Sequence, residues 1–152
     1  RMGAVFFYHL TRNPLEQTLP VLLEKARGAG WRIEVRGCDP DRMGWLDERL
    51  WQGAKDSFLP HGVQGGPNDA LQPVLLTSGG AGNSPDCVMT IDGASVSSDE
   101  VEAMQRVCVL FDGTDAEAVQ QARVQWKNLT DAGCSAQYWS EEAGKWEKKA
   151  EK

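Results

Sequence analysis

The segment that decides the fold class reads Val107-Cys108-Val109-Leu110-Phe111-Asp112-Gly113. Its apolar run, rich in β-branched and aromatic residues, predicts a buried strand, and the Asp-Gly pair predicts the turn that stops it. Thr114 or Asp115 is suited to cap a long helix, which should run to Ala132 and end at Gly133. A buried strand followed by a helix is the repeating unit of an α/β fold.

The same alternation extends on both sides of this segment. Further strands are predicted at 5–8, 32–35, 73–77, 87–91 and 135–139, the last of them as an edge strand. Helices are predicted to start at Asn13-Pro14 and Asp39-Pro40, because Asn or Asp can cap a helix and Pro suits its first position. Pro20 predicts either a kink in the first of these helices or the start of its main body. A short helix is predicted over 100–104.

This pattern predicts one α/β domain over residues 2–146, a three-layer α/β/α sandwich with a mostly parallel sheet. The charged residues 147–152 are predicted to form a frayed tail. The length of 152 residues fits one domain, and a hydrophobic content of 41% suffices for a core without a metal or disulfide.

Composition also bounds the location and the partners. The net charge of −6 argues against a groove that binds nucleic acid through phosphates, although an acidic protein can carry a local basic patch. No apolar run approaches the roughly 20 residues of a membrane span, and no signal peptide is recognised. The four cysteines lack any metal-ligand or paired spacing, so we expect reduced, structural thiols, no metal and a cytoplasmic protein.

An enzyme on this fold is the first alternative to test. A dinucleotide site needs a glycine-rich turn directly after the first strand, and no glycine stands there. The run Ser78-Gly79-Gly80-Ala81-Gly82-Asn83 lacks the ending of a phosphate loop and is interpreted as a plain loop. Asp92 and Asp112 follow strands, where catalytic acids often lie, but each precedes glycine and equally predicts a turn. His9 and His61 are possible bases without an identifiable nucleophile. We therefore expect no catalytic residue and no cofactor.

The long helix carries the most informative surface pattern. Its core stripe is predicted from Val119, Ala122, Trp126 and Leu129, and an adjoining stripe carries Arg123, Lys127 and Thr130. A basic stripe beside a large aromatic side chain can bind an acidic peptide end, with cations on the carboxylates and an apolar pocket for a side chain. The alternative is a solvated helix face with Trp126 in the core.

Trp51 and Phe58 stand near the end of the second helix and the loop that follows. Large aromatic residues in such places anchor protein interfaces, and ordinary core packing is the alternative.

Several segments together resemble the chi subunit family of bacterial DNA polymerase III. The matching segments cover nearly the whole chain in the family's order: Phe6-Phe7-Tyr8-His9-Leu10, Leu46-Asp47-Glu48-Arg49-Leu50-Trp51, Ser57-Phe58-Leu59-Pro60-His61-Gly62, Gln72-Pro73-Val74-Leu75-Leu76 and Ala122-Arg123-Val124-Gln125-Trp126-Lys127 followed by Gly133. The order and spacing of Leu50-Trp51 followed by Ser57-Phe58-Leu59-Pro60-His61 are specific for this family. The ending Gly144-Lys145-Trp146-Glu147-Lys148-Lys149 resembles the alphaproteobacterial branch.

The resemblance implies a Rossmann-like α/β/α fold without nucleotide catalysis. It also implies a non-catalytic adapter that binds the acidic C-terminal tail of single-stranded-DNA-binding protein. Arg123, Trp126 and Lys127 match the family's tail-binding positions, with Trp126 in place of a Tyr. A further basic position of the family falls at Val119, so part of the basic clamp is missing. Whether the lysines of the ending compensate is left open; they are Lys145, Lys148 and Lys149.

Two further expectations follow from the resemblance. Trp51 and Phe58 match positions at which the family binds the psi subunit or a competing helicase. The adapter is expected to join the clamp-loader complex, to reach DNA only indirectly and to contact no membrane. A nucleotide-dependent enzyme on a Rossmann-like fold remains the alternative.

Overall fold

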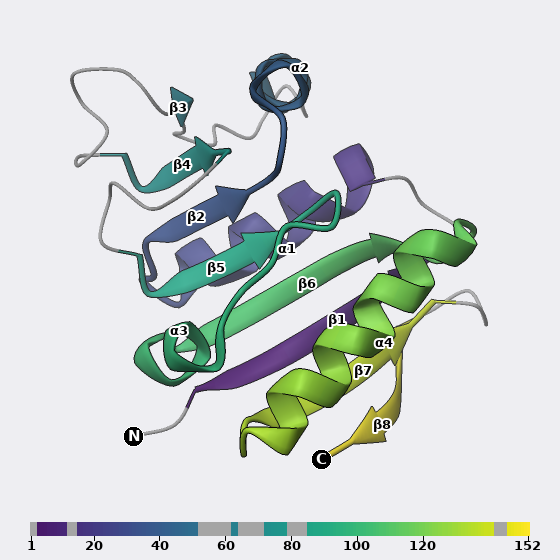
Figure 1. Ribbon diagram of the computed structural model, residues 1–152. Helices are drawn as coiled ribbons and strands as arrows, with labels where there is room; N and C mark the ends of the chain where they lie inside the picture. Colours follow the sequence, from purple (N-terminus) through teal and green to yellow (C-terminus); the bar gives the residue numbers. More distant parts are fainter. Residues whose placement is uncertain (1–2, 12–14, 52–61, 64–71, 79–84, 142–145) are drawn as a thin grey trace.

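A computed structural model describes residues 3–11, 15–51, 62–63, 72–78, 85–141 and 146–152, with Glu16 and Trp51 described by their backbone alone. An eight-stranded sheet runs through the molecule in the order β3-β4-β2-β5-β6-β1-β7-β8 (Figure 1). Its strands are β1 (Ala4–Leu10), β2 (Ile33–Arg36), β3 (Gly62–Val63), β4 (Val74–Thr77), β5 (Cys87–Thr90), β6 (Arg106–Asp112), β7 (Ser135–Ser140) and β8 (Glu147–Glu151). All neighbours pair in parallel except β7 and β8, which are antiparallel.

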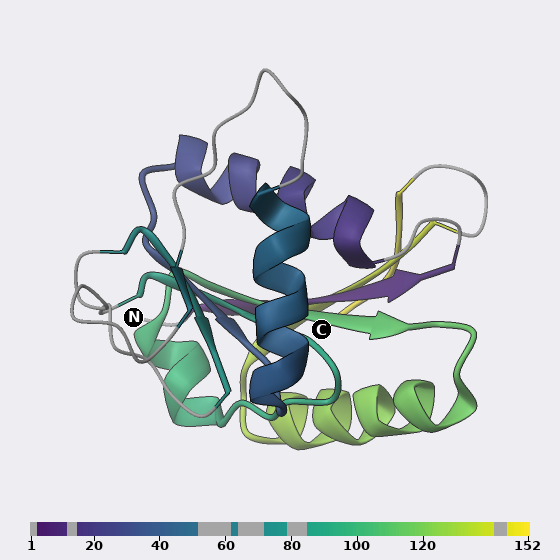
Figure 2. The same ribbon diagram turned by 90° about the horizontal axis from the view of Figure 1, so that it is seen from above.

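The helices cover both faces of this sheet. They are α1 (Leu15–Gly28), α2 (Pro40–Trp51), α3 (Ser98–Ala103) and α4 (Ala116–Asp131). In Figure 2, α1 lies on one side of the sheet, and α3 and α4 lie on the other. The fold is therefore the three-layer α/β/α sandwich that the alternation of elements predicts, and its sheet is mostly parallel.

Strand alternation divides the core into two halves. On β1, Val5 and Phe7 point to the half beneath α4, whereas Leu10 belongs to the half beneath α1 and α2. On β6, Val109 joins the α4 half and Cys108 the α1 half. Because β6 is buried on both faces over residues 107–111, its sequence there is a continuous apolar run.

The structure differs from the predicted elements at two places. The short strand β3 lies between the second helix and the strand predicted at 73–77, where no strand is predicted. Glu147–Glu151 does not fray but forms β8, which pairs with β7. As a result β7 is an internal strand, not the predicted edge. Of the two alternatives for Pro20, a helix start there is wrong, because α1 already begins at Leu15 and includes Pro20.

Candidate functional site

The predicted tail-binding residues all lie on α4, which is placed by its cap and its buried side. Asp115 caps the helix: its carboxylate accepts from the backbone N–H groups of Glu117 and Ala118. Ala122 and Leu129 face the sheet and are buried. The predicted core stripe is confirmed, since Val119 and Trp126 are partly buried against the same core half.

The two predicted cations are exposed on the outer side of α4. Arg123 is exposed and makes no ion pair with any described residue. Lys127, with 76% of its side chain exposed, holds Asp131 at 3.1 Å. An exposed pair of this kind is weak, about 0.3–0.5 kcal/mol, so a stronger carboxylate ligand can displace Asp131. The surface thus offers two accessible cations one helical turn apart.

Trp126 joins this surface to the core. Its indole packs edge-on against Phe7, with ring centroids 5.4 Å apart, and against Tyr138 at 6.2 Å. The hydroxyl of Tyr138 is hydrogen-bonded to His9 Nδ1 at 2.7 Å, and the His9 ring lies 5.2 Å from that of Phe111. The ring of Trp126 therefore packs against the core, as the second alternative expects, and its role in peptide binding stays a prediction.

Tyr138 and His9 were missed as neighbours of this surface. No short-range pattern connects them, since they are 129 residues apart and meet only because β1 and β7 are adjacent strands. The residue type of His9 is only a weak signal, since it indicates a possible base without an identifiable nucleophile. In the structure its hydrogen-bond partner is the Tyr138 phenol.

Other predicted residues are placed as follows. Phe58, Lys145 and the side chain of Trp51 lie outside the described residues, so the predicted partner contact stays a prediction. Lys148 holds Glu151 at 3.0 Å and Lys149 holds Glu147 at 3.4 Å. The glycine run after β4 begins at Ser78, and its residues beyond Ser78 also lie outside the described part of the chain.

The aspartates that follow strands serve as turn residues. Asp112 Oδ1 accepts from the backbone N–H and the hydroxyl of Thr114, and these bonds lower the pKa of Asp112. Asp92 adopts a positive φ of 54° in its turn and holds Arg42 at 2.9 Å. The four cysteines are free thiols, and three of them are buried. Hydrogen bonding with Cys108, together with burial, raises the pKa of Cys87 and keeps that thiol protonated.

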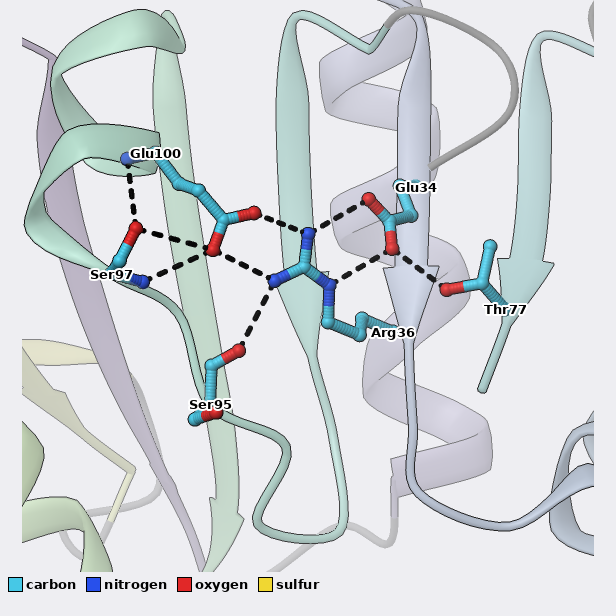
Figure 3. Close-up of polar contacts among 6 residues, drawn as sticks. All are labelled: Glu34, Arg36, Thr77, Ser95, Ser97 and Glu100. Carbon is cyan, nitrogen blue, oxygen red and sulfur yellow. Dashed lines mark hydrogen bonds and ion pairs between the residues drawn. The ribbon is translucent and has the colours of Figure 1, made fainter. Parts of the chain in front are cut away.

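A partly buried ionic cluster connects β2 with β4 and α3 (Figure 3). The guanidinium of Arg36 binds both oxygens of Glu34, at 2.9 and 3.1 Å, and both oxygens of Glu100, at 3.1 and 2.6 Å. It also donates to the Ser95 carbonyl at 3.1 Å. Glu34 is fully buried and accepts a further bond from Thr77 at 2.7 Å.

The charged groups of this cluster stabilise one another and thereby connect the elements that carry them. The hydrogen bonds from Arg36, with those from Ser97, lower the pKa of Glu100, and the two carboxylates raise that of Arg36. Glu100 also completes the capping box of α3 with Ser97. Each charged group already has strong partners, so the cluster stabilises the fold and has little left to offer a ligand.

Among the described residues, no three His, Cys, Asp or Glu side chains gather as a metal would require. Within the same part of the chain, every helix is too short or too polar to cross a bilayer.

Comparison with known proteins gives two matches. The family model described as "DNA polymerase III chi subunit, HolC" matches residues 2–137. A Rickettsia prowazekii (strain Madrid E) protein named "Probable DNA polymerase III subunit chi" is 26% identical over 70 residues. That alignment covers 46% of this chain and 42% of the relative's length.

Proposed function

Because this chain belongs to the DNA polymerase III chi subunit family, we propose that it is a cytoplasmic, non-catalytic adapter for single-stranded-DNA-binding protein. It binds the acidic C-terminal tail of that protein on the outer side of α4 and links it to the clamp loader. The observation that carries this proposal is the exposed cation pair, Arg123 and Lys127, beside the anchored ring of Trp126.

The binding chemistry follows from charge and burial. On a chain with net charge −6, a short acidic peptide needs a local basic site, and Arg123 without an ion pair in the described part supplies one. Arg123 and Lys127 receive the terminal carboxylate and the acidic side chains. The terminal Phe packs at Trp126, whose indole is held in place by Phe7 and Tyr138. A peptide that is disordered before binding should bind with modest affinity, on the order of micromolar.

The rival, a nucleotide-dependent enzyme, is disfavoured by the cavity where such folds bind ligands. This cavity of about 670 Å³ lies at the carboxyl ends of β1, β5 and β6, the usual ligand site of open α/β sheets. Among the lining residues that the structure describes, the charged ones are one arginine, already paired with Asp92, and four carboxylates: Arg42, Asp92, Asp112, Asp115 and Glu117. The N-terminus of α4 is occupied by the Asp115 carboxylate. A phosphate would therefore meet negative charge where it needs free N–H groups.

The remaining partners belong to the same proposal. Trp51 and Phe58 dock the psi subunit or a helicase, and DNA is reached through single-stranded-DNA-binding protein, in keeping with the chain's negative charge.

The test is fluorescence anisotropy with the labelled tail peptide. Arg123→Ala should weaken binding by roughly 1–3 kcal/mol, about 5- to 150-fold in Kd, because it removes a charge-assisted hydrogen bond. Arg27→Ala is the matched control, since Arg27 is an exposed arginine at the end of α1. Equal affinity of Arg123→Ala and the wild type would remove Arg123 from the site. A thermal shift with ATP, GTP, NAD or NADP would instead favour the enzyme.

A further inference from the structure

A second cavity, of about 650 Å³, lies between α1 and the sheet. We call it the α1 groove. In Figure 1, α1 lies behind β2 and β5, and no described helix lies behind β7 and β8. The lining of the groove reaches from α1 to Trp139 on β7 and to Trp146. Its α1 side is formed by Gln17, Thr18, Val21, Leu22, Lys25 and Ala26, and Ala29 follows directly after the helix.

The wall opposite α1 is aromatic. Tyr8 and Trp139 are register partners on β1 and β7 and face the same side of the sheet. Trp146 packs edge-on against Tyr8 with ring centroids 5.4 Å apart, and Trp31 also lines the groove. Val21 stands at the groove with 52% of its surface exposed. Tryptophan, tyrosine and arginine are the residue types that dominate binding energy at protein interfaces.

The charges of the groove have one sign. Lys25 and Arg106 are the charged residues among its described lining, which holds no carboxylate. Neither cation is ion-paired within the described part of the chain. On a chain of net charge −6 this is a local positive site, and its charge complement is an anionic ligand with an apolar part.

The ring geometry favours a peptide over single-stranded nucleic acid. Base stacking needs open ring faces, but the Arg106 guanidinium lies 5.2 Å from the centroid of the Trp31 ring. Trp146 meets Tyr8 edge-on, so these two rings do not present parallel faces. A concave apolar pocket suits a single large side chain. Because the protein is acidic overall, two cations match a few carboxylates of a peptide better than they match a long phosphate backbone.

We propose that the α1 groove binds an acidic segment of a partner protein, which inserts one large apolar side chain between α1 and Trp139 while its carboxylates contact Lys25 and Arg106. This site lies on the opposite side of the sheet from Arg123 and Lys127, and it stands whether or not the α4 surface binds a tail.

The probe is a fluorescein-labelled peptide Asp-Glu-Asp-Trp-Glu-Asp with an amidated C-terminus, so that it lacks the terminal carboxylate proposed to bind at α4. Anisotropy would compare the wild type with Lys25→Glu and Trp139→Ala, with folding of each checked by its thermal midpoint. Arg27→Glu is the matched control, because it makes the same charge change on the same helix at an exposed residue outside the groove lining.

We expect Lys25→Glu to weaken binding about fivefold or more and Arg27→Glu to leave it within about twofold. Trp139→Ala should weaken binding about tenfold through loss of the apolar wall. Binding that Lys25→Glu leaves intact would overturn the proposal, as would binding that Arg123→Ala abolishes, since the peptide would then sit on α4. Tighter binding of an oligothymidine of 12 nucleotides, lost in Lys25→Glu, would make the groove a nucleic-acid site and equally overturn it.

Discussion

The indole of Trp126 lies edge-on against the ring of Phe7, with the ring centroids 5.4 Å apart, and this contact joins α4 to the central strand β1. Trp126 is also adjacent in sequence to Lys127 and borders the proposed tail site. One side chain therefore serves both the packing of α4 and the surface that α4 presents, and the two roles need separate measurements.

Trp126→Ala should lower the free energy of unfolding by about 2–4 kcal/mol, because it leaves a cavity beside Phe7 and Tyr138. Trp126→Tyr should cost less, since a phenol ring fills part of the space. Urea unfolding measures both, and Val124→Ala, at a half-exposed residue of the same helix, is the control with a change near zero. An unchanged midpoint for Trp126→Ala would show that the ring does not anchor α4.

Arg36→Met should cost roughly 3–5 kcal/mol of stability, because it leaves the fully buried Glu34 carboxylate without its cation. The double variant Arg36→Met/Glu34→Gln should recover part of this loss, since the uncompensated charge is gone. Chemical denaturation of the wild type, Arg36→Met, Glu34→Gln and the double variant gives the coupling free energy between the two residues. Purely additive effects would contradict the ion pair as the source of the cost.

Stability should fall in acid partly through Glu100. Because Arg36 holds the pKa of Glu100 below its ordinary value of 4.5, this carboxylate stabilises the folded state above that value. The contribution is lost as the pH falls from there through the lower folded pKa. Thermal unfolding between pH 6 and pH 3 should show a shallower acid slope for Glu100→Gln than for the wild type. Parallel slopes would mean that Glu100 is not paired in solution.

Gly113→Ala should be destabilising by about 1–3 kcal/mol, because a Cβ there would collide with the His9 ring and come within 2.9 Å of the Leu10 carbonyl oxygen. Relief requires movement of His9, which would break its hydrogen bond with Tyr138. Thermal unfolding reports the cost, and the imidazole resonances of His9 report the displacement. Gly28→Ala is the control, since a Cβ at Gly28 meets no atom within 4 Å.

Tail binding at α4 should weaken as salt rises, because exposed cations attract the peptide through screened charge. The wild-type Kd should increase several-fold between about 50 and 300 mM NaCl, and Arg123→Ala should show a smaller salt slope. A peptide without its terminal Phe should bind much more weakly at every salt concentration. A Kd independent of salt would contradict the role given to Arg123 and Lys127.

The sequence by itself determined the layered α/β architecture and the exposed cation pair of α4. Both depend on short-range patterns: continuous apolar runs such as 107–111, Asp115 as a cap, and the helical period that places Arg123 and Lys127 on one side. Such signals act over a few residues and can be interpreted without the fold.

Only the tertiary structure decided which distant side chains meet. The charged segment Glu147–Glu151 is a strand because β7 offers it an unpaired edge, which no property of its own sequence indicates. Arg36 pairs with Glu100 across 64 residues, and His9 with Tyr138 across 129, because the sheet order places their elements side by side. The α1 groove likewise needs one helix and several strands to form its walls. These contacts depend on the order of the strands in the sheet. That order is determined by chain entropy and burial over the whole domain, and no local sequence pattern encodes it.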